Sequence, residues 1–302
     1  MPELPEVEIT CIGLKPILQK SISNIIIRNP SLRWPIPSHL KKTLPNQKIL
    51  FIKRRAKYIL VQFEKGTLMI HLGMSGRLEI LDKETPPKKH DHVDITFHNS
   101  KNILRYTDPR RFGSIFWIDG DIKDHFLISR LGPEPLESLF TGDYLFSKAQ
   151  NKKSPIKNII MDSHIVVGVG NIYASESLFK AGVIPSKLGK DTSLDECTKI
   201  VKHIKATLIK AIELGGSSLK DFYNVNGQSG YFQQTYNVYG MKGKPCRKCK
   251  SIIENMKIGQ RSSFFCIKCQ NSLILSLFVS LTIFGNKDPT IIPIILLPKP
   301  IS

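Results

Sequence analysis

Short apolar runs alternate with turn-forming residues between Ile22 and Ile118. The runs are rich in β-branched and aromatic side chains, and turns such as Glu64-Lys65-Gly66 separate them. Strands at this spacing are typical of an antiparallel β-sandwich. The predicted strands are Ser23–Arg28, Lys48–Arg54, Tyr58–Phe63, Thr67–His71, Gly76–Leu81, Val93–Phe97, Ile103–Tyr106 and Ser114–Ile118.

Helical spacing appears on both sides of these strands. The N-terminal segment has apolar residues three and four positions apart, which places them on one face of a helix. That face comprises Leu4, Val7, Cys11, Leu14 and Leu18. Beyond about Leu145 helices dominate, and the clearest are Ile172–Ala181 and Leu194–Leu214. The second follows a Ser193 cap with Glu196 three residues later. We therefore predict an α+β protein in which an antiparallel β-sandwich flanked by helices precedes a helical domain.

The same patterns suggest where the chain divides. The expected parts are a β-sandwich domain over 2–132, a linker over 133–150, a helical domain over 151–236, a cysteine-rich unit over 237–270 and an apolar tail over 271–302. The apolar runs of the tail are shorter than the roughly 20 residues that span a bilayer. Contact with a membrane surface, binding of a partner, and translation beyond an ancestral stop all remain open for it.

Charge narrows the choice of partners. The 302 residues carry a net charge of +19, while 41% hydrophobic content indicates a folded protein. Such an excess attracts polyanions through counterion release, so nucleic acid is the first candidate and an acidic membrane surface the second. A solvated lysine-rich surface is the alternative. No basic region followed by an apolar run marks the N-terminus, so we expect a cytosolic protein.

Four of the six cysteines form a metal-binding pattern. Cys246 and Cys249 are separated by two residues, as are Cys266 and Cys269, and sixteen residues lie between the pairs. Two such pairs can converge on one tetrahedral zinc ion around a β-hairpin. Four thiolates leave no open coordination position, so the predicted Zn²⁺ is structural. The remaining Cys11 and Cys197 are expected to be buried, reduced thiols.

The first residues offer a nucleophile. Removal of Met1 would give Pro2 a free secondary amine, and a model α-amino group has a pKa of about 7.7–8.0. An unprotonated amine beside carboxylates can form a Schiff base with a sugar. Glu3 and Glu6 are three residues apart and share a helix face, so both can face one pocket.

A glycine-rich turn joins a predicted helix at Val167–Glu176. Exposed N–H groups at such a helix start can bind an anion. A dinucleotide-binding loop is the rival interpretation, but Tyr173 occupies the place of its third glycine. From these residues alone, a plain helix N-terminus is the better interpretation.

Three elements together resemble one known family. The Pro2–Glu8 start, the turn that contains Asn171 and the four-cysteine unit are similar to those of formamidopyrimidine-DNA glycosylases, in matching order from Pro2 to about Gln270. The resemblance implies a helix-two-turns-helix domain, a zinc finger, and a bifunctional glycosylase and AP lyase that excises oxidised purines from duplex DNA. It assigns the nucleophile to Pro2, acid catalysis to Glu3, and proton donation or phosphate handling to Lys57 and Arg261.

The resemblance also implies the contacts with DNA. Met74, Arg110 and Phe112 match wedge residues that enter the duplex when a base is extruded. Core packing is the alternative for Met74 and Phe112, and a solvated charge is the alternative for Arg261. Further DNA contacts are implied for His71, His90, Lys153 and Asn171. The segment from Ser217 to Phe232 is expected to be a mobile loop that closes over the base.

Two other functions compete with this interpretation. Endonuclease VIII-like enzymes prefer oxidised pyrimidines and typically begin Pro-Glu-Gly-Pro, so Leu4 favours the purine branch. A non-catalytic zinc-ribbon DNA-binding protein would explain the charge and the cysteines but would leave Pro2 and Glu3 without a role. We expect a monomer that acts on duplex DNA in the bacterial cytosol without a catalytic metal or organic cofactor.

Overall fold

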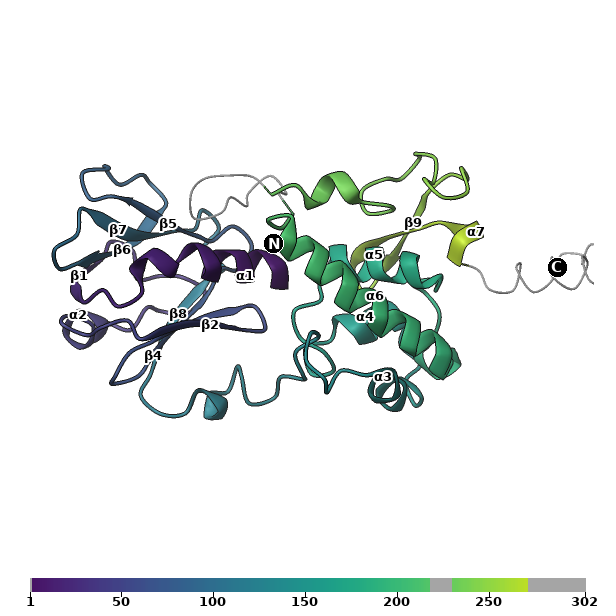
Figure 1. Ribbon diagram of the computed structural model, residues 1–302, viewed down its shortest axis with the longest axis horizontal. Coiled ribbons are helices and arrows are strands. Elements are labelled where there is room, and N and C mark those ends of the chain that lie inside the picture. The colour runs from purple at the N-terminus through teal and green to yellow at the C-terminus, as the bar shows by residue number, and fades with distance from the viewer. Residues whose placement is uncertain (1, 218–229, 271–302) are drawn as a thin grey trace, which may run out of the picture.

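The computed structural model describes residues 2–217 and 230–270, which form two lobes joined side by side (Figure 1). The N-terminal lobe contains two four-stranded antiparallel sheets with the orders β1-β6-β7-β5 and β2-β3-β4-β8. The strands are β1 (Ile22–Ile27), β2 (Phe51–Arg55), β3 (Tyr58–Gln62), β4 (Thr67–His71), β5 (Arg77–Asp82), β6 (Asp91–Phe97), β7 (Asn102–Thr107) and β8 (Ser114–Ile118). The predicted sandwich and all its strands are confirmed, with small shifts at the strand ends.

The apolar side chains of both sheets meet in one core. Ile25 and Leu104 from the first sheet and Ile59 and Ile70 from the second belong to the same buried cluster. Successive side chains of a strand point to opposite faces, and these apolar residues lie on the inner faces of the two sheets. The short elements around the sandwich are the helix α2 (Leu40–Thr43) and the 3₁₀ turns η1 (Lys15–Ile17) and η2 (Ile122–Asp124).

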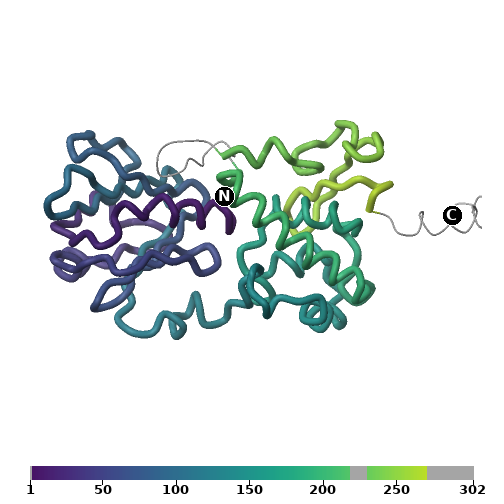
Figure 2. The backbone as a smooth tube through the Cα atoms, viewed as in Figure 1, coloured from purple at the N-terminus to yellow at the C-terminus, as the bar shows by residue number. Residues whose placement is uncertain are grey.

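Helix α1 (Leu4–Gly13) belongs to both lobes. Val7, Cys11 and Leu14 pack into the sandwich core, whereas Leu4 packs into the core of the C-terminal lobe. The predicted apolar face therefore exists, but two different cores share it, and Leu18 lies beyond the helix end. Both views show the first turn of α1 where the lobes meet (Figure 1, Figure 2).

The C-terminal lobe is built around helices. Its elements are α3 (Gly142–Ala149), α4 (Ile156–Met161), α5 (Asn171–Ala181), α6 (Leu194–Glu213), α7 (Ile267–Gln270), the 3₁₀ turns η3 (Gly189–Asp191) and η4 (Phe232–Thr235), and the hairpin of β9 (Glu254–Ile258) and β10 (Arg261–Phe265). The predicted Ser193–Glu196 capping box at the start of α6 is present.

One part of the expected linker is not a linker. Helix α3 lies within the predicted segment 133–150, and its Leu145 and Ala149 are fully buried in the C-terminal core. Thr141 accepts a hydrogen bond from the Tyr144 N–H and so starts this helix. A helix of eight residues carries too little periodic signal to be distinguished from a polar connection by sequence alone. The chain before α3 runs along one side from lobe to lobe (Figure 2).

Two expectations lie outside the described residues. They are the mobile loop, except for its ends at Ser217 and at residues 230–232, and the tail over 271–302. Among the residues that the structure describes, no helix has the length and apolar character to cross a membrane.

Candidate active site

The Glu3 carboxylate lies against the start of α5. It accepts hydrogen bonds from the backbone N–H groups of Gly170 at 2.9 Å, Ile172 at 3.2 Å and Tyr173 at 3.5 Å. Glu3 is 3% exposed, and Pro2 beside it is also buried. The first N–H groups of a helix have no partner within the helix and favour a negative charge. The Glu3 side chain is thereby held at the junction of the lobes.

This arrangement corrects the interpretation of the glycine-rich turn as an exposed anion site. Its N–H groups do bind an anion, but that anion is the carboxylate of Glu3 in the same chain. The glycines make the approach possible, because a Cβ atom at Gly170 would overlap Glu3 and one at Gly168 would overlap Leu4. The Leu4 N–H also donates to the Gly168 carbonyl at 3.1 Å.

Glu6 joins the same junction to a third segment. Its carboxylate accepts from the Glu3 N–H at 2.8 Å, the Tyr173 hydroxyl at 2.5 Å and the Ser217 N–H at 2.8 Å. Glu6 is 2% exposed, and three donors offset the cost of burying it. The predicted shared face of Glu3 and Glu6 is therefore real, although the two carboxylates bind different partners.

Burial raises the pKa of the Glu3 carboxyl above its ordinary value. The positive charge of Lys57 opposes this change in pKa, whereas the negative charge of Glu6 adds to it. Burial also lowers the pKa of Lys57. The negative charge of Glu3 raises this pKa in part, and the positive charge of Arg261 lowers it further. A carboxyl of raised pKa near an amine of lowered pKa is an arrangement suited to general acid–base catalysis.

Lys57 stands on a two-residue turn between β2 and β3. Ala56 in that turn has φ = 54°, a left-handed conformation that costs energy in a residue with a Cβ atom. The Ala56 N–H donates to Glu134 at 2.7 Å, and the same carboxylate accepts from Arg54 at 2.6 Å and Arg55 at 2.8 Å. Glu134, which the sequence analysis missed, therefore fixes the turn that carries Lys57.

A cavity of about 220 Å³ lies between the two lobes. Three of its lining residues can bear a positive charge, namely Lys57, His71 and Arg261. Burial, with Lys57 and Arg33 nearby, lowers the pKa of His71 to about 4, so this imidazole is neutral at pH 7. Its Nδ1 accepts from the Gly73 N–H at 3.1 Å, which leaves Nε2 as the donor. These donors suit a phosphate group.

A second cavity of about 600 Å³ adjoins the first, because His71 lines both. It lies beside the two loops that carry Met74 and Phe112. Its lining residues are Ser31, Leu32, Arg33, His71, Gly73, Met74, Arg110, Arg111 and Phe112. Phe112 is 45% exposed and Arg110 is also exposed, so the core-packing alternative fails for Phe112. Met74 is half-buried.

Lys157 is a further site residue that sequence reasoning missed. It is 1% exposed, and its ammonium donates to Asn171 Oδ1 at 2.5 Å and Ser263 Oγ at 2.6 Å. Burial and the charge of Arg261 lower its pKa to about 8. Asn171 in turn donates to the Ser262 carbonyl at 3.1 Å. The sequence offered one sign of this role, which is a single lysine within the mostly apolar segment that forms α4.

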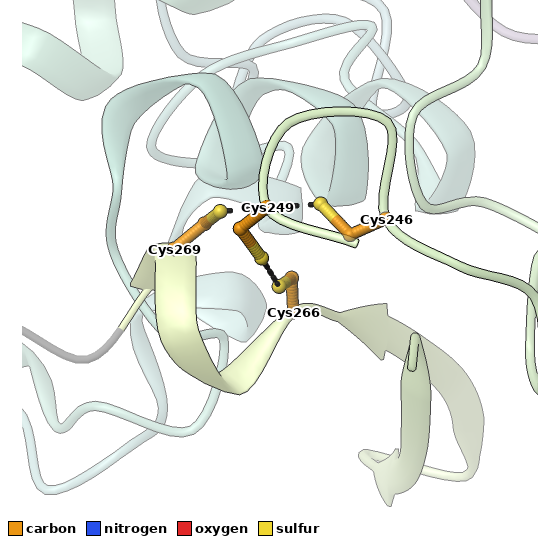
Figure 3. Close-up of side chains that lie close together, drawn as sticks. All are labelled: Cys246, Cys249, Cys266 and Cys269. Atoms are coloured by element: carbon orange, nitrogen blue, oxygen red, sulfur yellow. Dashed lines mark hydrogen bonds between the residues drawn. The ribbon is translucent and has the colours of Figure 1, made fainter. Parts of the chain in front are cut away.

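The four predicted zinc ligands converge from two segments (Figure 3). The Sγ atoms of Cys246, Cys249, Cys266 and Cys269 lie within 4.8 Å of one another. Tetrahedral zinc with bonds of about 2.3 Å places neighbouring sulfurs roughly 3.8 Å apart. The observed separations of 3.9 Å for Cys246 and Cys269, and 3.4 Å for Cys249 and Cys266, suit one structural Zn²⁺. Within residues 2–217 and 230–270 this is the one group with metal-binding geometry.

Comparison with known proteins agrees with this architecture. Three family descriptions match successive parts of the chain: formamidopyrimidine-DNA glycosylase N-terminal domain over residues 1–115, formamidopyrimidine-DNA glycosylase H2TH domain over 131–223, and zinc finger found in FPG and IleRS over 243–271. A formamidopyrimidine-DNA glycosylase of Methylobacillus flagellatus is 50% identical over 270 residues, covering 89% of this chain and 96% of the relative. The chain belongs to the formamidopyrimidine-DNA glycosylase family.

Solved structures of the glycosylase family share the fold. A Lactococcus lactis FPG mutant in complex with Fapy-dG-containing DNA is 32% identical with a TM-score of 0.84, covering 90% of this chain and 100% of that one. A MutM in complex with DNA containing carbocyclic 8-oxo-G is also 32% identical with a TM-score of 0.83, over 90% and 100% of the chains. The helix-two-turns-helix domain and the zinc finger of this glycosylase-family chain are thereby established.

The residues singled out by sequence lie in four places on this member of the glycosylase family. Pro2, Glu3, Lys57, His71, Arg261 and Asn171 lie at the junction of the lobes. Met74, Arg110 and Phe112 lie on the neighbouring loops. His90 precedes β6, and its carbonyl accepts from the Asp108 N–H at 3.1 Å. Lys153 is exposed between α3 and α4 and lines neither cavity described above.

Proposed function

We propose that this protein is a bifunctional DNA glycosylase and AP lyase that excises oxidised purines, such as 8-oxoguanine and formamidopyrimidines, from duplex DNA. The observation that carries the proposal is the buried Glu3 carboxylate of raised pKa, which lies beside Pro2 and near Lys57. Family membership supports it, as do relatives whose structures contain Fapy-dG or 8-oxo-G DNA.

The first step requires a free Pro2 amine, which arises when Met1 is removed. The amine attacks C1′ of the damaged nucleotide, and the bond from C1′ to the base breaks, with its electron pair leaving on the base. Glu3 gives its proton to the O4′ atom of the sugar, and the C1′–O4′ bond opens. The amine loses its proton, so that an iminium joins Pro2 to the sugar.

The lyase steps follow from the iminium. It makes the C2′ hydrogen acidic, so loss of that proton expels the 3′ phosphate by β-elimination. A second elimination expels the 5′ phosphate. Lys57 and Arg261, which line the cavity between the lobes, supply proton donation and phosphate binding during these steps. The zinc ion of the finger takes no part in the reaction, since four thiolates would fill its coordination sphere.

DNA binding uses the faces that surround the cavities. Met74, Arg110 and Phe112 fill the space that the extruded base leaves, and the cations around them contact phosphates. Further DNA contacts are assigned to His71, His90, Lys153 and Asn171, of which Asn171 meets a phosphate. The protein acts as a monomer in the bacterial cytoplasm. Its parts are a catalytic domain over 2–132, a helix-two-turns-helix domain that includes α3 and continues to residue 236, and the zinc finger over 237–270.

Borohydride trapping tests the proposal directly. Reduction during the reaction with an 8-oxoguanine duplex should give a covalent protein–DNA adduct, because borohydride reduces an iminium to a stable amine. Peptide mass spectrometry should place the added mass on Pro2, with Met1 absent. The control is an undamaged duplex of the same sequence, which should give no adduct.

Three outcomes would contradict this function. An adduct on a lysine side chain would remove Pro2 as the nucleophile. Complete absence of trapping, together with tight DNA binding, would support a non-catalytic zinc-ribbon protein. Excision that is faster from a thymine glycol duplex than from an 8-oxoguanine duplex would instead indicate the pyrimidine-specific branch.

A further inference from the structure

A buried carboxylate lies beneath the two loops that carry the wedge residues. Asp108, at the end of β7, is 0% exposed. Its side-chain oxygens accept from Ser75 Oγ at 2.7 Å, the Gly113 N–H at 2.8 Å and the Tyr106 hydroxyl at 3.2 Å. A carboxylate is costly to bury unless donors surround it, so its position depends on these groups.

The donors come from both loops. Ser75 follows Met74 in the loop after β4, whereas Gly113 follows Phe112 in the loop before β8. The Ser75 hydroxyl also accepts from the Arg110 N–H at 3.1 Å, so one side chain bridges Asp108 and the second loop. The loops also touch directly, because a Cβ atom at Gly73 would overlap the backbone of Phe112. Hydrogen bonds and close packing therefore join the two loops.

The exposed side of this unit carries the side chains assigned to the wedge. The Arg110 guanidinium lies 4.8 Å from the centroid of the Phe112 ring, and both side chains are exposed. The backbone of Asp108 reaches the His90 segment as well. Its N–H donates to the His90 carbonyl, and its carbonyl accepts from His92 Nε2 at 2.8 Å. Three segments assigned to DNA contact thus meet at one residue.

We propose that Asp108 is a positioning residue that locks Met74, Arg110 and Phe112 into a single rigid wedge, with Ser75 as the link between the loops. This inference rests on the proposed function. A wedge must hold its shape while it replaces a stacked base. If its loops became ordered only on binding, that ordering would cost part of the binding free energy. Asp108 fixes the two loops together before DNA arrives.

The test is a set of variants compared in single-turnover excision of 8-oxoguanine from duplex DNA. Ser75→Ala removes the hydroxyl that links the loops and leaves the Asp108 carboxylate in place. We expect excision to slow about tenfold. The matched control is Ser23→Ala, which removes a hydroxyl bonded to Thr96 Oγ1 in the same sandwich, and it should change the rate by less than about twofold.

A double-mutant cycle separates positioning from a general loss of stability. In a Phe112→Ala background, Ser75→Ala should cause little further loss of rate, because the serine acts through the wedge that is already damaged. Rate losses that multiply would overturn the inference. If Ser75→Ala fails to fold, Tyr106→Phe, which removes a different donor to Asp108 while keeping the ring, should show the same non-additivity with Phe112→Ala. If the wild-type protein gives no excision, the proposed function itself has failed.

Discussion

At the scale of single residues, Glu3 owes its properties to its place between two helices. It precedes α1, yet its carboxylate binds the N–H groups at the start of α5. Burial raises its pKa, while those N–H groups and Lys57 stabilise its charged form. The side chain can therefore both hold and release a proton, as a general acid must.

Substitution of Glu3 should separate catalysis from binding. Glu3→Gln keeps the shape of the side chain but cannot donate a proton to a sugar oxygen, so excision of 8-oxoguanine should fall by about a hundredfold or more. Affinity for an undamaged duplex, measured by fluorescence anisotropy, should stay within about threefold. The control Glu84→Gln changes an exposed carboxylate and should leave both quantities unaltered.

The pH dependence of excision should also reveal the role of Glu3 as the acid. Glu3 must be protonated and the Pro2 amine unprotonated, so kcat/KM should rise and then fall with pH. Because the pKa of Glu3 is raised, its protonated form persists to higher pH than an ordinary glutamic acid allows. The pH profile of the residual activity of Glu3→Gln should no longer fall at high pH, because ionisation of Glu3 produces that fall in the wild type. An unchanged profile in this variant would exclude Glu3 as the acid.

At the scale of secondary-structure elements, the hairpin of β2 and β3 depends on a residue far away in sequence. Glu134 lies in the connection between the lobes and binds Arg54, Arg55 and the Ala56 N–H at the hairpin turn. Arg54 also donates to Glu8 on α1 at 2.7 Å. The turn with Lys57, the connection and the first helix are therefore one hydrogen-bonded unit.

Removal of the Glu134 charge should loosen this unit. Glu134→Gln leaves two arginines without their shared carboxylate, and breaking a buried ion pair costs about 3 kcal/mol. Denaturant unfolding near pH 7 should show this loss of stability. The exposed Glu137→Gln on the same connection should change stability by less than about 0.5 kcal/mol.

Acid should abolish the difference in stability between the Glu134→Gln variant and the wild type. Although burial opposes ionisation, Arg54 holds the pKa of Glu134 below its ordinary value. A carboxyl of lowered pKa stabilises the fold above its unfolded pKa of about 4.3, and this contribution disappears as pH falls through the folded pKa. The stability of the two proteins should therefore begin to converge as pH falls below about 4.3 and become equal only below the lowered folded pKa of Glu134. A gap that stays constant into acid would contradict the role of the charge.

At the scale of the whole molecule, contacts between the lobes and the finger define the site. Lys157 on α4 reaches both Asn171 on α5 and Ser263 on β10, so the finger is attached to the helices that hold Glu3. Glu176 on α5 reinforces this attachment through the N–H groups of Asn237, Val238 and Tyr239. The position of Arg261 therefore depends on the fold of the zinc finger.

Removal of zinc should weaken DNA binding while the β-sandwich stays folded. Four free thiols cannot hold the hairpin of β9 and β10, so metal-free protein should lose affinity for an 8-oxoguanine duplex by about tenfold or more. The sandwich has its own core, and its strand signal in circular dichroism should persist. Full recovery of affinity on addition of Zn²⁺ is the control, and unchanged affinity in metal-free protein would refute this role.

The net charge of +19 makes a separate prediction about salt. Each phosphate neutralised by lysine or arginine releases a counterion, so the logarithm of the affinity should fall linearly with the logarithm of salt concentration. A protein that makes several phosphate contacts should lose about a thousandfold in affinity between 50 and 200 mM salt. A flat dependence would mean that the cations are ordinary surface charges.

The sequence by itself determined the elements and the metal site, because both depend on short-range patterns. Alternation of apolar residues specified the strands of the sandwich, and the capping box specified the start of α6. Two Cys-x-x-Cys pairs specified zinc, since the ligand spacing within each pair is local. The family resemblance was also visible, because its motifs are short and lie in order.

Only the tertiary structure decided how distant residues share charge and hydrogen bonds. It showed that the glycine-rich turn binds Glu3, that Glu134 fixes the turn of Lys57, and that Asp108 joins two loops. Each of these carboxylates bonds to groups more than thirty residues away in sequence. Burial and electrostatic environment arise from such long-range packing, and no local pattern of residues encodes them.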